Sequence, residues 1–227
     1  MKENNNNHIV FPLVMGTLAL LCFLAVALMV SLSVQPLWGH LTVLILPAIV
    51  LYAIAFISYK EKISSPMTVV LTVLASIVLV LASFFYSLLL FVWSATMEIN
   101  DVKYYSKAYS RIENGEGVEG IFPDAIPGDA KDISFRYNAP FLQGGEIFEL
   151  SFVSSGEAIS QWEGKLEASS EWVGSNEEWH RLNNWGFIGE DSTRYQIYWD
   201  GGYNHGEWSY VLIDGQSMRI TFHYEDW

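Results

Sequence analysis

The side chains best suited to acid–base or metal chemistry lie near the C-terminal end of the sequence. His223 falls in a stretch of alternating apolar and polar residues, His205 lies in the turn before a neighbouring stretch of this kind, and Asp200 precedes both. If these stretches pair as strands, the two imidazoles and the carboxylate can meet in a metal or acid–base cluster. Ordinary surface histidines are the simpler interpretation, so an envelope hydrolase using the His205/His223 region is only the third hypothesis.

The turn that contains His205 also carries oxygen ligands of the kind that calcium prefers. Its weak candidate ligands are Asp200, Asn204 and Glu207. An EF-hand loop needs Gly at its sixth position and Glu at its twelfth, where this sequence has His205 and Val211. A hairpin turn is the better interpretation, so no metal is assigned. The sequence also lacks H-E-x-x-H, G-x-S-x-G and phosphate-binding glycine motifs, so we expect no cofactor and a non-enzyme rather than an enzyme.

Tryptophan is concentrated at the same end of the chain, where seven of the nine lie beyond residue 160. Trp172, Trp185 and Trp227 fit no apolar stripe and could stack on sugars or grip a partner. Together with His205 and His223 they form the candidate ligand-binding set. The tryptophans that do fit an apolar stripe are interpreted as core residues; these are Trp162, Trp179, Trp199 and Trp208.

Charge divides the chain into two parts. Asn4 to Tyr59 and Ile63 to Met97 contain no Asp, Glu, Lys or Arg, whereas residues 98–227 carry 23 acids against nine bases, a net charge of −14. An ionised side chain at the bilayer centre costs a few kcal/mol or more, so the charge-free runs suit hydrocarbon. The acidic part would attract cations or cationic peptides and repel nucleic acid, so nucleic-acid binding is excluded.

Residues 1–97 are therefore expected to form a membrane domain. A bilayer span needs about 20 apolar residues, and the segments at about 9–34, 41–59 and 66–93 are long enough. Pro47 predicts a kink in the second segment. The third carries small residues at Ala75/Ser76 and Ala82/Ser83, which predict close packing within the bundle or docking onto another membrane protein.

The few basic residues of this part predict its orientation. Lys2 lies at the N-terminus and Lys60 and Lys62 lie between the second and third segments. Because basic residues favour the cytoplasmic side, the N-terminus and this loop are expected in the cytoplasm. The C-terminal domain then lies outside the cell membrane. Its connection, residues 98–117, has apolar side chains at helical spacing at Val102, Tyr105, Tyr109 and Ile112, which predicts a short amphipathic helix.

Residues 118–227 read as an α+β domain. Five stretches alternate with period two, which predicts half-buried strands. Ser154/Glu157 and Ser175/Glu178 are capping-box pairs, each predicting a helix start. We expect an antiparallel sheet of about five strands with two helices on one face. The inward strand residues are Ile133, Phe135, Tyr137, Phe148, Leu150, Phe152, Tyr195, Ile197, Trp199, Trp208, Tyr210, Leu212, Met218, Ile220, Phe222 and Tyr224.

Several phrases of this domain resemble an uncharacterised family of membrane-anchored proteins from Gram-positive bacteria. They are IFPDAIPGDAKDISFRY, FLQGGEIFELSF, NHGEWSYVLID and the terminal YEDW. The match covers most of the outer domain and hardly touches the membrane helices. It implies a bacterial cell membrane and an outer-face domain, and it implies no activity, ligand or catalytic residue.

The sequence supports three functions, in order of preference. The first is a non-enzymatic, membrane-anchored, extracytoplasmic binding or interaction module, whose aromatic-rich acidic domain engages a protein partner or an envelope ligand. The second is an accessory subunit of a larger membrane complex, recognised through the small residues of the third helix. The third is an envelope hydrolase that uses the two C-terminal histidines. The bilayer itself is the partner that all three share.

Overall fold

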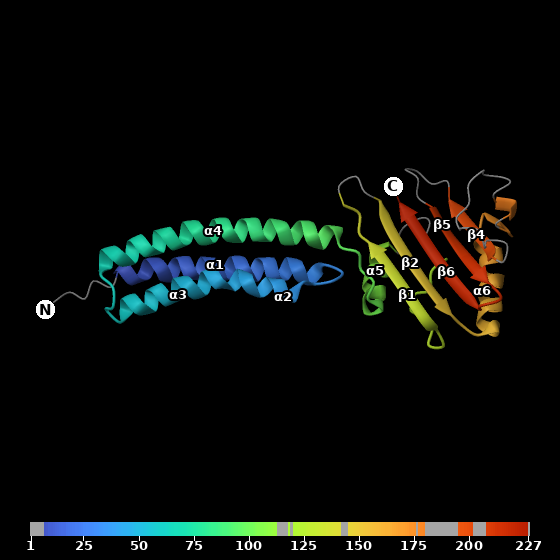
Figure 1. Ribbon diagram of the computed structural model, residues 1–227, viewed down its shortest axis with the longest axis horizontal. Coiled ribbons are helices and arrows are strands. Elements are labelled where there is room, and N and C mark those ends of the chain that lie inside the picture. Colours follow the sequence, from blue (N-terminus) through green and yellow to red (C-terminus); the bar gives the residue numbers. More distant parts are fainter. Residues whose placement is uncertain are drawn as a thin grey trace. The chain divides into compact units, whose positions relative to one another are not determined.

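The computed structural model describes residues 7–112, 118, 120–141, 145–175, 177–179, 195–201 and 208–226. The chain divides into two compact units, Met1–Ser94 and Ala95–Trp227. The first unit is built from helices, and the second from a sheet with helices packed on it (Figure 1).

The first unit consists of apolar helices that follow one another closely along the chain. They are α1 (Asn7–Leu32), α2 (Trp38–Leu41), the 3-10 segment η1 (Thr42–Ile45), α3 (Leu46–Tyr59) and α4 (Ser65–Thr96). Just before Pro47, where the sequence predicted a kink, the structure has the 3-10 segment η1, which ends where α3 begins. Pro47 has no N–H to donate to the carbonyl of Val43, so the α-helical ladder cannot run through this point without a break.

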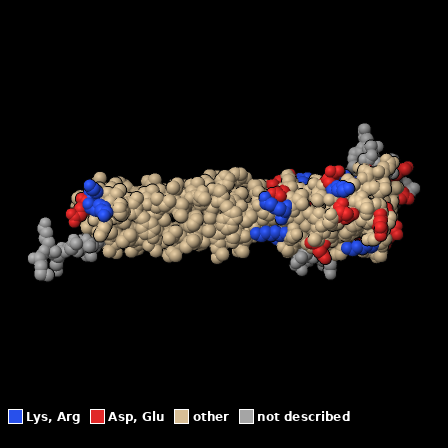
Figure 2. All heavy atoms as spheres, turned by 90° about the horizontal axis from the view of Figure 1, so that it is seen from below, with Lys and Arg blue, Asp and Glu red and all other residues tan. Residues whose placement is uncertain are grey.

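Three of the described helical segments are long and apolar enough to cross a bilayer: His8–Leu32, Trp38–Tyr59 and Ser65–Thr96. Their outward side chains are large and apolar; Leu28, Phe84 and Leu89 are 67%, 63% and 67% exposed. On the face that Figure 2 shows, charged side chains are absent from the long middle stretch of this unit. An apolar surface of this extent is stable in hydrocarbon and not in water, so the chain is a membrane protein, as predicted.

A glycine allows α1 and α3 to pack closely. A Cβ atom at Gly16 would lie 3.3 Å from ring carbons of Tyr52. The next residue, Thr17, forms a hydrogen bond with the Tyr52 hydroxyl at 3.0 Å between the two oxygens. Small residues at helix contacts are the usual means by which membrane helices approach each other. Figure 1 shows α1 and α3 side by side.

Among the described residues of the second unit, six strands form one antiparallel sheet in the order β1-β2-β6-β5-β4-β3. The expected five strands are present. The sixth, β3, was not predicted, because four residues are too short to display an alternating pattern. The strands are β1 (Lys131–Asn138), β2 (Glu146–Val153), β3 (Trp172–Ser175), β4 (Tyr195–Gly201), β5 (Trp208–Asp214) and β6 (Arg219–Asp226).

One face of this sheet is covered by α5 (Tyr105–Ile112) and α6 (Gly156–Ser169). The Tyr105 ring lies 5.5 Å from that of Phe148, and the Trp162 ring of α6 lies 5.0 Å from that of Phe222. The amphipathic helix predicted in the juxtamembrane connection is therefore α5, and it belongs to the core of the second unit. The apolar strand side chains on this face with 0% exposure are Phe148, Leu150, Phe152, Ile220 and Phe222.

The helix positions differ from the prediction in two respects. Ser155, and not Ser154, caps α6, because its Oγ accepts the N–H of Ala158 at 3.2 Å. Ser154 instead donates its hydroxyl to Asp129 at 2.6 Å. The second predicted capping box is present, since Ser175 Oγ accepts from the Glu178 N–H and the Glu178 carboxylate accepts from the Ser175 N–H. The segment that begins at this capping box contributes Trp179 to the opposite face of the sheet. The two helices that share one face are therefore α5 and α6, and not α6 and this segment.

Both edges of the sheet are short or irregular. The β3 edge has only four residues. At the β1 edge, Ile99 forms a single antiparallel bridge with Tyr137, with both N···O distances 2.9 Å. The register of β1 shifts between Lys131 and Ser134, where Asp132 has φ 47°. Met218, predicted as an inward strand residue, lies in the turn before β6 and is 40% exposed.

Replacement of Phe148 by alanine tests the core on the α5/α6 side. We expect Phe148→Ala to lower the free energy of unfolding by about 3–5 kcal/mol, because a large cavity would remain among tightly packed rings. Met218→Ala is the matched control and should change it by less than about 0.5 kcal/mol. Denaturant unfolding of the full chain in detergent, followed by tryptophan fluorescence, measures both. The rings that contact Phe148 are Tyr105, Tyr109, Phe122, Phe135 and Tyr137. Equal effects of the two substitutions would contradict this account of the core.

Candidate functional site

The face of the sheet opposite α5 and α6 carries a row of aromatic and ionisable residues that crosses all six strands. Directly opposed partners in an antiparallel sheet project to the same side, so the register defines the row. It starts from Trp172 on β3, and each member is the register partner of the next. We name this set the cross-strand row; it consists of Trp172, Trp199, Tyr210, His223, Glu149 and Arg136.

The β3, β4 and β5 half of the row is aromatic, and neighbouring rings extend it. Trp179 lies 5.0 Å from Trp172 and 4.7 Å from Trp199, measured between ring centroids. Trp208 stacks on Trp199 at 5.2 Å and on Tyr210 at 5.5 Å. Trp179 and Tyr210 are buried, whereas Trp172, Trp199 and Trp208 are half-buried. Part of each of these three indoles therefore remains accessible. We refer to the five rings together as the aromatic face.

Two glycines allow the indoles to lie flat against the strands. A Cβ atom at Gly174 would lie 2.6 Å from Cζ2 of Trp172, and one at Gly201 would lie 2.6 Å from Cζ2 of Trp199. Each glycine stands two residues after its tryptophan, on the same side of the strand. No other residue leaves room for the ring there, so Trp-x-Gly within a strand is a sequence signal for this arrangement, whereas Trp162-Glu163-Gly164 has the same pattern on α6 without it.

The other half of the row is ionisable. The His223 ring stacks on Tyr210 at 4.6 Å. Its Nδ1 lies 3.1 Å from a carboxylate oxygen of Glu149, and its Nε2 lies 3.4 Å from one of Glu225. A neutral imidazole has one N–H and can donate to only one of these carboxylates, whereas an imidazolium can donate to both. At the end of the row, Arg136 Nε donates to Glu98 at 3.0 Å.

The protonation states of two row members follow from these contacts. The hydrogen bond from His223 holds the pKa of Glu149 below its usual range, although partial burial acts in the opposite direction. The charges of His223 and Arg136 act with the hydrogen bond. Burial raises the pKa of the Tyr210 hydroxyl, and the carboxylates of Glu149 and Glu225 raise it further. Tyr210 therefore stays protonated at neutral pH, and the row holds an ionised Glu149 beside neutral aromatic rings.

The structure places two of the predicted site residues in the same row, places a third on the opposite face, and does not describe the others. Trp172 and His223 both belong to the cross-strand row. Asp200 alternates with Trp199 along β4 and so lies on the other face of the sheet, away from His223. Trp185, Trp227 and His205 lie outside the described residues, as do the two other weak calcium ligands, Asn204 and Glu207. Within the described ranges, no group of three His, Cys, Asp or Glu side chains is placed to hold a metal ion.

The carboxylate partners of His223 and the true position of the aromatic face were not predicted from the sequence. Glu149 and Glu225 received no role, although Glu149 alternates with the buried Phe148 and Leu150. Trp199, Trp208 and Tyr210 were interpreted as part of the same core as the β2 and β6 residues, whereas they lie on the opposite side of the sheet. The sequence places Glu149 on the side of β2 opposite Phe148 and Leu150. This position indicates a contact with His223 only once β2 is known to pair with β6.

Acid should weaken the second unit through Glu149. Its pKa is below the usual value of 4.5 in the folded state, so it stabilises the fold above pH 4.5 and loses this effect as the pH falls through the lowered value. We expect Glu149→Gln to flatten the decline of unfolding free energy below pH 4.5. The measurement is denaturant unfolding of the full chain at a series of pH values.

The control for this prediction is the same substitution in a His223→Gln background. Without the imidazole, most of the effect of Glu149→Gln on the acid slope should disappear, because the two residues interact directly. An identical acid slope for wild type and Glu149→Gln would show that the pair does not contribute.

Comparison of the chain with protein-family models, with curated proteins and with solved structures finds no match. The geometry of the cross-strand row and the aromatic face is therefore the basis on which a function can be proposed.

Proposed function

We propose that the protein is a non-enzymatic binding module, anchored in the cell membrane by three helices and engaging a protein partner or an envelope ligand outside the cell. The observation that carries this proposal is the aromatic face, with three half-buried indoles beside two carboxylates. Tryptophan and tyrosine are, together with arginine, the residues enriched among those that dominate binding energy at protein interfaces. Their alignment by strand register gives a rigid surface, which costs little ordering entropy on binding.

The basic residues of the membrane unit support the outward orientation. Lys60 and Lys62 lie in the turn between α3 and α4, and residues 33–37 between α1 and α2 contain no Lys or Arg. Because basic loops favour the cytoplasmic side, the α3–α4 turn faces the cytoplasm and the C-terminal end of α4 faces outward.

The chemistry of the aromatic face favours a cationic ligand. Ammonium and guanidinium groups are attracted to the faces of indole and phenol rings. Glu225, the register partner of Trp208, places a carboxylate beside these rings. The net charge of −14 in residues 98–227 would steer cations toward the domain. A lysine or arginine side chain of a partner protein, or an amino group of an envelope polymer, fits this surface.

The environment of His223 favours binding over catalysis. Its side chain is 10% exposed, and both ring nitrogens face carboxylates. A general base needs a nitrogen that can reach the proton of a substrate. Within the described residues, His223 acts instead as a bridge that holds Glu149 and Glu225 beside the rings.

Binding of a lysine-rich peptide tests the proposed ligand class. Full-length protein in neutral detergent is titrated with this peptide, with a glutamate-rich peptide and with a neutral oligosaccharide, using calorimetry. We expect the lysine-rich peptide to bind, and salt to weaken it, because the contacts are electrostatic in part. Trp208→Ala should weaken binding roughly tenfold. Trp162→Phe, on the covered side of the sheet, should leave it unchanged.

The other outcomes separate the alternatives. Oligosaccharide binding that depends on Trp208 would identify a sugar-stacking surface and exclude the cationic ligand. If none of the three ligands binds in a manner that depends on Trp208, the aromatic face serves only as part of the hydrophobic core and the proposal fails.

Cysteine labelling tests the orientation. In a Cys22→Ala background, which removes the only native cysteine, Glu61→Cys and Glu171→Cys are each treated in intact cells with a membrane-impermeant maleimide. We expect the reagent to modify the cysteine at position 171 and not the one at 61, because only the former lies outside. After the cells are lysed, both should react. The reverse pattern would place the second unit in the cytoplasm.

A further inference from the structure

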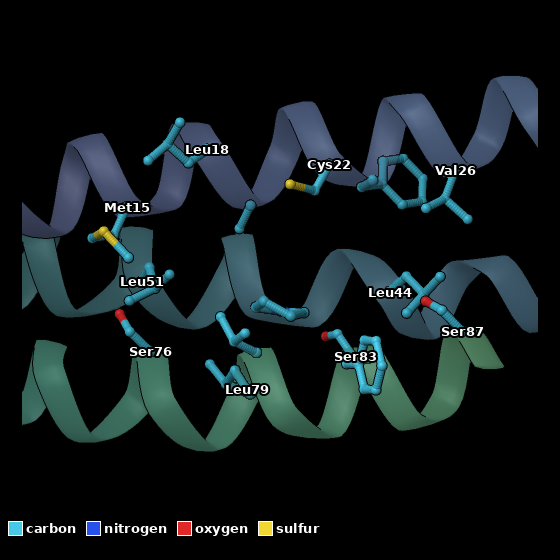
Figure 3. Close-up of a pocket in the computed structure, with 15 residues that line it drawn as sticks. Met15, Leu18, Cys22, Val26, Leu44, Leu51, Ser76, Leu79, Ser83 and Ser87 are labelled. Atoms are coloured by element: carbon cyan, nitrogen blue, oxygen red, sulfur yellow. The ribbon is translucent and has the colours of Figure 1, made fainter. Parts of the chain in front are cut away.

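A cavity of about 370 Å³ lies between α1, α3 and α4 in the membrane unit. This volume falls within the range of roughly 300–1,000 Å³ that small-molecule sites occupy. Its wall is formed mainly by apolar side chains from all three helices (Figure 3). They include Leu18, Leu51, Leu79, Val80 and Phe84.

Hydroxyl groups of α4 interrupt this apolar wall. Ser76, Ser83 and Ser87 all line the cavity and are spaced seven and four residues apart, which places them on one face of the helix. Figure 3 shows the Ser76 hydroxyl pointing from α4 toward Leu51 of α3. The small-residue stripe predicted on this helix therefore contributes Ser76 and Ser83 to the interior of the bundle.

Ser76 differs from the hydroxyl residues that precede it on the same face of α4. Thr72 donates to the carbonyl of Thr68 at 2.8 Å, and the Thr68 hydroxyl lies 2.7 Å from that of Ser58. Ser76 is only 8% exposed, and within the described residues its Oγ has no hydrogen-bond partner. A buried hydroxyl without a partner is costly in hydrocarbon, where no water replaces the missing bond. One unsatisfied polar group thus lies in the wall of the cavity.

We propose that this cavity binds one uncharged lipid chain carrying a hydroxyl or carbonyl group, which forms a hydrogen bond with Ser76. Because most of the lining is apolar, a hydrocarbon chain fills this cavity better than water does. The lining contains no Asp, Glu, Lys, Arg or His to neutralise a charged ligand. Leu18, Val80 and Phe84 line the cavity and are also 50%, 61% and 63% exposed, so a chain can enter sideways from the bilayer.

Photolabelling of the full-length protein in lipid nanodiscs tests this site. The probes are a long-chain alcohol bearing a diazirine and the matched alkane that lacks the hydroxyl. Peptide mass spectrometry locates the labelled residues. We expect saturable labelling of cavity-lining residues by the alcohol, and competition by the same alcohol without diazirine. Ser76→Ala should reduce labelling by the alcohol roughly threefold, as expected for one hydrogen bond inside a membrane protein, and should not affect the alkane. Ser76→Thr should retain labelling.

A second pair of variants controls for location. Leu79→Trp fills the cavity and should abolish labelling of its lining, whereas Ala82→Phe adds a ring at an exposed position outside the lining and should not. Labelling that is insensitive to both Ser76→Ala and Leu79→Trp would overturn the proposal. So would crosslinks from cavity residues to a second protein in native membranes, since a partner helix would then be the occupant.

Discussion

The pairing of β2 with β6 is the contact on which the second unit depends. It joins the β1–β2 hairpin to the β6–β5–β4–β3 half of the sheet, across about 70 residues of chain. On one side, Phe148 opposes Tyr224 and Leu150 opposes Phe222, which places their side chains in the core beneath α5 and α6. On the other side, the same register places Glu149 opposite His223. A slip by one residue would exchange the two faces, so the core and the cross-strand row are specified together.

The two units solve the same burial problem in different solvents. In the second unit the apolar side chains face inward, whereas many of the described acidic side chains, such as Asp101, Asp132 and Glu157, are exposed to water. In the first unit the apolar side chains face outward into hydrocarbon, and small or hydroxyl residues such as Gly16 and Thr68 lie at the helix contacts. Polar side chains inside a membrane bundle are therefore candidates for a functional role. Ser76 is such a candidate, whereas a serine on the water-exposed surface of the second unit would not be.

Local patterns in the sequence were sufficient for much of this fold. The spans, the start of α4 near Ser65, the α5 helix and the inward residues of β1, β2 and β6 all follow from periodicity and capping. Neither β3 nor the pairing of β2 with β6 follows from them, because a four-residue strand shows no period and long-range pairing leaves no local trace. This limit affected the candidate site more than the fold. His223 was identified from the sequence, but its contacts with Glu149 and Glu225 could not be predicted without knowing how the strands pair. The Trp-x-Gly pattern at Trp172 and Trp199 was readable, yet its meaning depends on the ring lying over the glycine.

The structure of the two sheet edges affects how densely copies of the protein can occupy a membrane without aggregating. Anchored domains are confined to two dimensions, where encounters between open strand edges would favour aggregation by strand addition. Here the outer side of β1 is occupied at Tyr137 by Ile99 and distorted near Asp132, and the edge at β3 is only four residues long. Neither edge offers a long, regular template to a neighbouring copy. The domain can therefore be present at high surface density and still present the flat side of its sheet, rather than its margins, to other molecules.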